Sequence, residues 1–258
     1  MSTLILCLHS SGSPTSMWRN VARMPALAAT PVLAPALLGY PPNPRIPVGA
    51  VLAPDADVAH VRALLPADLS RLHLVGHSYG GVVALQLARE LAPIVRSVWV
   101  YEPVLFSALM HDPTADSAAR AEAIAMFGDP AFRDPAVAGS AEWCERFVDY
   151  WNRPGAFARM TREQRDALIA VGGKIYAEVL ILFGPRGTFA DWHRDVPMTV
   201  AYGSETRATA RAMAVALAGA NPKAMLEVVP ACGHMAPLTD PAAIARSLEA
   251  HFARVQPL

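Results

Sequence analysis

The stretch LHLVGHSYGGVVALQLA, residues 72–88, joins an apolar run to a series of small and apolar residues at helical spacing. Between the two lies Gly76-His77-Ser78-Tyr79-Gly80, a G-x-S-x-G motif. At a strand-to-helix junction, this motif is typical of a sharp turn that exposes the serine hydroxyl at a helix N-terminus. Glycines are needed there because larger side chains would collide with the strand and the helix. We interpret Ser78 as a candidate nucleophile, and the alternative is an ordinary glycine-rich turn.

Outward from this stretch, short apolar runs alternate with helical patterns. Near-continuous apolar runs are typical of parallel strands that are covered on both faces. A strand–helix alternation favours a doubly wound, mostly parallel α/β sheet. The segments expected to be strands are 3–9, 72–77, 95–103 and 196–203, with a short one within 30–47 and a last one at the start of the segment 224–235, and the expected helices are 55–66, 80–92 and 240–255.

The middle third of the chain differs, because helical patterns and aromatic residues dominate it. From about residue 105 to residue 193 we find no strand pattern, and most of the tryptophans and phenylalanines lie there. We therefore expect a helical insertion, or cap, at 105–193. The core of the α/β fold would then be made of residues 1–104 and 194–258.

Composition limits the classes of function. The 258 residues are 53% hydrophobic and 17% charged, which argues against disorder. The 22 basic residues balance the 22 acidic ones without a basic run, so nucleic acid is not an expected partner. Three widely spaced cysteines indicate neither a disulfide framework nor a metal site. We expect a cytoplasmic protein without a membrane span, since no apolar run approaches the required length.

A serine hydroxyl needs a general base, and His234 is the best placed of the eight histidines. It lies in the segment PACGHMAPLTDP, residues 230–241, after the last predicted strand and before the last predicted helix. The order is therefore serine first and histidine last. The other histidines carry no catalytic motif, and we expect structural or solvated roles for them.

Together these segments resemble the α/β-hydrolase superfamily over essentially the whole chain. The similar pieces are LCLHSSGSPTSMW (6–18), GHSYGG (76–81), the helical region after YEP (101–103), and GHMAPLTDP (233–241). The first resembles the oxyanion loop, the second the nucleophile turn and the last the histidine loop. One departure is His9-Ser10, which stands where the family usually has His-Gly.

The resemblance implies an oxyanion hole and a triad acid. The backbone N–H groups of Ser11 and Tyr79 would hold the oxyanion. The family usually has an aspartate three residues beyond the glycine that corresponds to Gly203, where this chain has threonine. Two candidates for the acid remain: Glu102, at a position that resembles the acid of some haloalkane dehalogenases and is favoured here, and Glu205.

The resemblance also implies a reaction class. Serine cannot readily replace the carboxylate nucleophile of dehalogenases and epoxide hydrolases, so acyl transfer to water fits best. We expect a carboxylesterase-like enzyme that needs no cofactor and acts on a small or medium apolar ester. A cofactor-free haloperoxidase or a C–C bond hydrolase would use the same triad, and a receptor-like ligand-binding protein is an alternative of another class. A homodimer through the cap is also left open.

Overall fold

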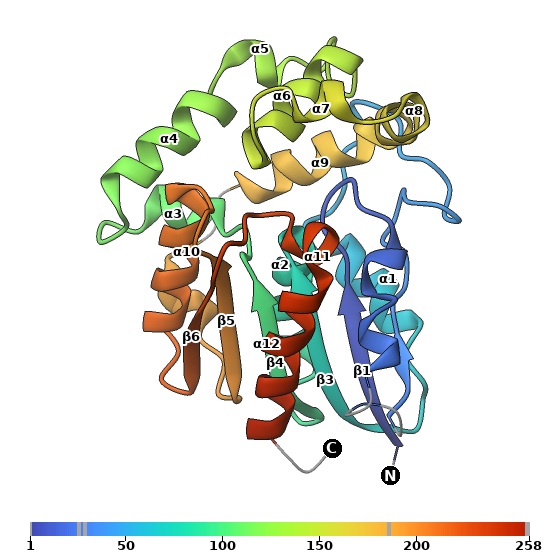
Figure 1. Ribbon diagram of the computed structural model, residues 1–258, viewed down its shortest axis with the longest axis vertical. Helices are drawn as coiled ribbons and strands as arrows, with labels where there is room; N and C mark the ends of the chain where they lie inside the picture. Colours follow the sequence, from blue (N-terminus) through green and yellow to red (C-terminus); the bar gives the residue numbers. More distant parts are fainter. Residues whose placement is uncertain (1, 25–26, 28–29, 185–186, 256–258) are drawn as a thin grey trace.

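A parallel sheet forms the centre of the protein (Figure 1). The computed structural model describes residues 2–24, 27, 30–184 and 187–255. Within them the sheet has the strand order β2-β1-β3-β4-β5-β6. The strands are β1 (Ser2–Leu8), β2 (Val32–Leu33), β3 (Leu69–His77), β4 (Val95–Tyr101), β5 (Met198–Gly203) and β6 (Ala224–Val229). The expected doubly wound sheet is confirmed.

The strand order determines where loops can converge. From β1 the chain goes outward to β2, then crosses back over β1 to β3 and continues to the opposite edge. The winding direction therefore changes between β1 and β3. In open α/β sheets, ligands bind outside the carboxyl ends of the strands at such a switch point. The loop after β1 begins at His9, and the turn after β3 contains Ser78.

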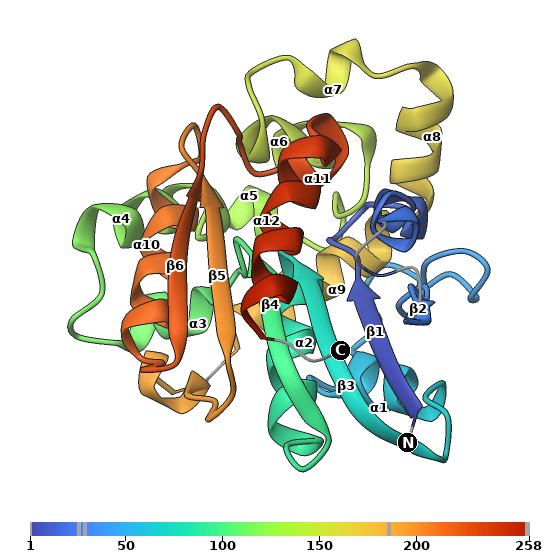
Figure 2. The ribbon, with the colours of Figure 1, turned by 60° about the horizontal axis from the view of Figure 1, so that its bottom comes forward.

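Helices cover both faces of the sheet (Figure 2). Alternate residues of a strand point to opposite faces, so β1 sends Leu4, Leu6 and Leu8 into one core and Ile5 and Cys7 into the other. The first core also contains residues from α1 (Ala56–Ala63), α2 (Tyr79–Glu90) and α10 (Ala208–Gly219). The second contains residues from α12 (Pro241–Arg254) and from the short 3-10 helices η1 (Thr15–Trp18) and η2 (Val21–Arg23).

A group of helices between β4 and β5 lies over the carboxyl ends of the strands, in the interval assigned to the cap (Figure 1). These helices are α3 (Phe106–His111), α4 (Ser117–Phe127), α5 (Pro130–Arg133), α6 (Ala141–Trp151), α7 (Ala156–Arg159), α8 (Arg162–Ala170) and α9 (Gly172–Leu182), followed by η4 (Phe189–Trp192). The short α11 (Ala236–Thr239) follows the β6 loop. None of the helices in the described part of the chain is long and apolar enough to cross a membrane.

Candidate active site

The turn between β3 and α2 holds Ser78 in a backbone conformation that non-glycine residues rarely adopt, with φ 54° and ψ −119°. At two positions of the turn, neighbouring backbone atoms lie so close that only glycine fits. A Cβ on Gly76 would lie 2.6 Å from the carbonyl oxygen of Gly80, and one on Gly80 would lie 2.3 Å from the carbonyl oxygen of Leu8. The motif glycines are thus required by steric contact. The turn places Ser78 immediately before the first residue of α2.

Ser78, His234 and Glu102 lie in one line of hydrogen bonds. The Ser78 Oγ atom is 3.1 Å from His234 Nε2, and His234 Nδ1 is 2.7 Å from Glu102 Oε2. All three side chains are buried. Because Glu102 is hydrogen-bonded to Nδ1 as an acceptor, Nδ1 carries the proton and Nε2 is free to accept the hydroxyl proton of Ser78. This is the arrangement that nucleophilic catalysis by serine requires.

The carboxylate of Glu102 is fixed by two further donors. Oε1 accepts a hydrogen bond from the Gly203 backbone N–H at 2.8 Å, and Oε2 accepts one from Thr206 Oγ1 at 2.7 Å. Thr206 is the residue that stands at the position where the family usually has aspartate. Glu102 itself has a positive φ of 45°. The β5 loop therefore supplies hydrogen-bond donors to an acid that comes from the end of β4.

Glu205, the other candidate acid, lies outside this line of hydrogen bonds. Its side chain is 53% exposed and its carboxylate is 3.3 Å from the guanidinium of Arg153, which is 83% exposed. An exposed pair of this kind contributes little to stability. Of the two candidates, the structure brings only Glu102 to His234.

The loop that carries His234 is fixed by residues at the ends of β3 and β4 and by an aromatic ring of α6. His77 Nε2 donates a hydrogen bond to the His234 carbonyl oxygen at 2.8 Å, and the Tyr101 hydroxyl donates one to the Gly233 carbonyl at 2.8 Å. Burial keeps the pKa of His77 well below its usual value, so this ring stays neutral. From the cap, the Trp151 ring stacks on the His234 ring with centroids 4.0 Å apart.

The two candidate oxyanion donors are the backbone N–H groups of Tyr79 and Ser11. As the first residue of α2, Tyr79 has no acceptor for its N–H within the helix. Ser11 follows the end of β1 and lines the same cavity as Ser78. The left-handed turn of this loop falls on Gly12, with φ 70°, and the Ser10 hydroxyl, where the family usually has glycine, is bonded to Ser13 at 2.7 Å. The loop therefore accommodates serine at position 10.

A cavity of about 320 Å³ opens above Ser78 and His234, between the core and the cap. Apart from His234, no lining residue that the structure describes is titratable. The apolar part of the wall is made by Phe147, Val148, Trp151, Ala156, Met160, Leu168, Met235 and Leu238. The described residues contain no group of three or more histidine, cysteine, aspartate or glutamate side chains that could hold a metal ion.

Some contributors to the site were not identified from the sequence. Trp143, Phe147, Tyr150 and Trp151 all lie on α6, and their spacing in the sequence does not show which of them reach the cavity. In the structure Phe147 and Trp151 line it, while Trp143 stacks on Phe132 within the cap. The hydrogen bond from Thr206 to Glu102 was also missed. The sequence contains one sign of this hydrogen bond: a residue able to donate one, Thr206, stands where the family usually has the acid.

Comparisons with known proteins show the family of this chain. The model of a family described as "Alpha/beta hydrolase family" matches residues 5–247. A lipase, LipV from Mycobacterium tuberculosis, is 28% identical over 202 residues, which are 78% of this chain and 66% of the lipase. The chain thus spans just under two thirds of the length of that relative.

Solved structures share the fold. An esterase from Thermogutta terrifontis matches with a TM-score of 0.67 and 17% identity, over 100% of this chain and 92% of the esterase. A meta-cleavage product hydrolase from Pseudomonas fluorescens IP01 matches with a TM-score of 0.69 and 17% identity, over 99% and 92%. At these identities the likeness shows the fold alone.

Proposed function

This chain belongs to the alpha/beta hydrolase family, and from that premise we propose that it is a serine hydrolase which cleaves small or medium apolar esters through an acyl-enzyme. The observation that carries the proposal is the hydrogen-bonded line from Ser78 through His234 to Glu102, at the base of an uncharged cavity. A relative named as a lipase supports ester hydrolysis.

The proposed reaction begins with attack of Ser78 Oγ on the ester carbonyl carbon. His234 Nε2 takes the hydroxyl proton and then returns it to the leaving alcohol oxygen. The resulting imidazolium is stabilised by Glu102, which is itself held by Gly203 and Thr206. The acyl-enzyme is then hydrolysed by water, for which His234 acts again as general base.

The negative charge that develops on the carbonyl oxygen needs hydrogen-bond donors. In the proposal, the backbone N–H groups of Ser11 and Tyr79 supply them, and the N-terminus of α2 adds its dipole. Removal of one such donor lowers kcat about 10²- to 10³-fold in known cases. In this proposal, the N-terminus of α2 next to Ser78 therefore helps to stabilise the oxyanion.

The cavity supports the substrate class. Its volume of about 320 Å³ is at the lower end of the range typical of small-molecule sites. Its wall is mainly apolar, and the described lining residues hold no arginine or lysine that would bind an anionic acyl group. A short, neutral acyl chain fits both conditions. A cofactor-free haloperoxidase or a C–C bond hydrolase would use the same triad and differ only in the substrate.

The test combines covalent labelling with turnover. A fluorophosphonate probe should label Ser78 in wild type, as located by peptide mass spectrometry, and should leave the Ser78→Ala variant unlabelled. With p-nitrophenyl esters of increasing acyl length, kcat/KM should be highest for short acyl chains and fall for long ones, because the cavity of about 320 Å³ is at the lower end of the typical range. A single covalent event per chain without turnover would instead identify a ligand-binding protein, and labelling with turnover only of a non-ester carbonyl substrate would favour a C–C bond hydrolase.

A further inference from the structure

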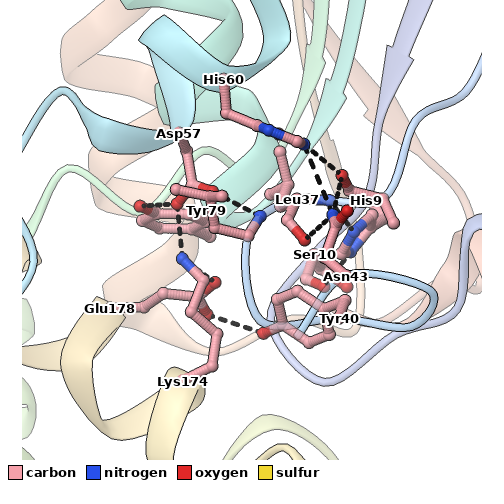
Figure 3. A network of polar contacts seen from close by, with 12 residues as sticks. His9, Ser10, Leu37, Tyr40, Asn43, Asp57, His60, Tyr79, Lys174 and Glu178 are labelled. Carbon is pink, nitrogen blue, oxygen red and sulfur yellow. Dashed lines mark hydrogen bonds and ion pairs between the residues drawn. The ribbon is translucent and has the colours of Figure 1, made fainter. Parts of the chain in front are cut away.

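A second group of charged residues lies buried close to the triad without belonging to it. Asp57 of α1 and Lys174 and Glu178 of α9 have side chains that are at most 2% exposed. Lys174 Nζ lies 2.5 Å from Asp57 Oδ2 and 3.1 Å from Glu178 Oε1 (Figure 3). Ion pairs that are removed from water add little net stability, because desolvation offsets their attraction. Packing alone therefore does not account for three buried ionisable side chains in one place.

One branch of hydrogen bonds leads from Glu178 to the loop after β1. The Gly12 backbone N–H donates to the Tyr40 hydroxyl at 2.9 Å, and that hydroxyl donates to Glu178 Oε2 at 2.9 Å. Gly12 directly follows Ser11, the first candidate oxyanion donor. The segment that carries the first candidate oxyanion donor is thus tied to α9 at Gly12, through the Tyr40 hydroxyl.

A second branch leads from Asp57 to the residue after the nucleophile. The Tyr79 hydroxyl donates to Asp57 Oδ2 at 2.8 Å, and Lys174 Nζ lies 5.0 Å from the centroid of the Tyr79 ring. Asp57 Oδ1 accepts from the Leu38 backbone N–H at 2.9 Å. The side chain of the second candidate oxyanion donor is therefore fixed by a carboxylate and a cation together (Figure 3).

Protonation states preserve both branches. Burial raises the pKa values of Tyr40 and Tyr79 well above their usual value, so both hydroxyls remain donors. Burial by itself would lower the pKa of Lys174, but the charges of Glu178 and Asp57 outweigh it and raise that pKa. Lys174 is therefore a cation at all ordinary pH values.

Helix α9 also lies in direct contact with the loops that it ties down. A Cβ on Gly12 would lie 3.2 Å from Ile175 Cδ1, and one on Gly39 would lie 3.0 Å from Lys174 Cβ. Side chains of α9 therefore lie close to the backbone of the loop after β1. Because α9 is part of the inserted helices, its position over the loop links the cap to the site.

We propose that Lys174 and Glu178 are positioning residues, which act through Asp57 and Tyr40 to hold the backbone N–H groups of Ser11 and Tyr79 at the spacing that an oxyanion requires. This inference rests on the proposed ester hydrolysis. Since the donors are main-chain groups, their geometry depends on what holds the two peptides in place. The cluster fixes both peptides, through Asp57 of α1 and through Lys174 and Glu178 of α9.

The least disruptive test is Tyr40→Phe, which removes a single hydroxyl and retains the ring that packs edge-on against His9. The matched control is Tyr176→Phe on α9, the helix of Glu178, because the Tyr176 hydroxyl donates to the Arg133 carbonyl at 2.6 Å rather than to the network around Glu178. We expect Tyr40→Phe to lower kcat for an ester about tenfold, with KM within about twofold of wild type, because a displaced donor loses part of the effect of a deleted one. Tyr176→Phe should keep the wild-type kcat.

Two further measurements separate positioning from general destabilisation. A trifluoromethyl ketone, which forms an oxyanion on Ser78, should bind about tenfold more weakly to Tyr40→Phe, whereas a non-reactive ester analogue should bind equally well. The Tyr40→Phe/Glu178→Gln double variant should lose less than the product of the single losses, since both act through one branch.

The outcomes distinguish this inference from the proposed function. A wild-type protein that neither turns over esters nor reacts at Ser78 would overturn both. Wild-type turnover, with Tyr40→Phe and Tyr176→Phe equal in kcat and in trifluoromethyl ketone affinity, would overturn the positioning role alone. A fall in thermal stability shared by both variants, with a lower kcat only in Tyr40→Phe, is the expected result.

Discussion

Replacing Glu102 by glutamine tests the choice of acid, because the structure determines how the amide would be oriented. Oε1 of Glu102 accepts from the Gly203 N–H at 2.8 Å, so the amide oxygen of the variant must occupy that position. The amide nitrogen then occupies the position of Oε2, where it faces His234 Nδ1. As a donor, it requires Nδ1 to be the unprotonated nitrogen.

The consequence is a histidine in the wrong tautomer. Nε2 of His234 would carry the proton and could no longer accept the proton of Ser78, although the three side chains would keep their positions. In a serine protease, the amide variant of the triad acid lowers kcat about 10⁴-fold. This corresponds to about 5.4 kcal/mol at 1.36 kcal/mol per tenfold change in rate. We expect a loss of that order in Glu102→Gln.

The assay is p-nitrophenyl ester hydrolysis by wild type, Glu102→Gln and Glu205→Gln, with circular dichroism to verify that each is folded. Glu205→Gln is the matched control, since its carboxylate is 53% exposed and bound only to an exposed arginine. It should remain within about twofold of wild type, as expected for loss of a surface ion pair. The reasoning is refuted if Glu102→Gln retains more than a tenth of the wild-type kcat, or if Glu205→Gln loses as much as Glu102→Gln does.

Two other expectations follow from the cap and from the buried histidines. Trp151→Ala removes the ring stacked 4.0 Å from His234, so kcat/KM for short esters should fall about 2- to 12-fold, the equivalent of about 0.5–1.5 kcal/mol of stacking, with no such fall in Tyr150→Phe. Burial lowers the pKa of His9 to about 4 and that of His251 to about 3. The unfolded chain therefore takes up protons below about pH 6.5 that the folded chain does not, and each histidine should reduce the free energy of unfolding by about 1.2 kcal/mol between pH 7 and pH 5.5. Urea unfolding at both pH values should show this decrease smaller by about 1 kcal/mol in His251→Asn, and an identical pH dependence in the two proteins would contradict the calculation.

Much of the fold was predictable because its signals are local. The motif around Ser78 combines a strand, a turn and a helix within a few residues, and steric contact at Gly76 and Gly80 explains each glycine. The alternation of strands and helices was also visible in the sequence. The strand order is the one expected of a doubly wound sheet, in which the chain crosses back from β2 and places β3 beside β1.

The acid was harder to predict, since Glu102 and Glu205 both follow neighbouring strands at the same end of the sheet. Which carboxylate reaches His234 depends on side-chain direction. At Glu102 that direction is accompanied by a positive φ, which the sequence pattern did not reveal. Which of the two carboxylates lies beside His234 is therefore determined by the tertiary structure.

The buried cluster was missed for a different reason. Lys174 and Glu178 are the only charged residues in the apolar run 167–184, a signal that was present in the sequence. Their partner Asp57 lies 117 positions before Lys174. A local pattern can flag two charges on one helix, but it cannot identify what they meet across such a distance.

The sequence distances between Ser78, Glu102 and His234 have a consequence for how the protein folds. His234 is 156 positions from Ser78 and 132 from Glu102. Contacts between such distant residues close late, because the entropy of a long loop must be overcome first. Refolding of the serine turn alone would restore a strand and a helix without reactivity. Recovery of probe labelling at Ser78 would therefore report the arrival of the last strand and its histidine loop, and would time completion of the whole sheet.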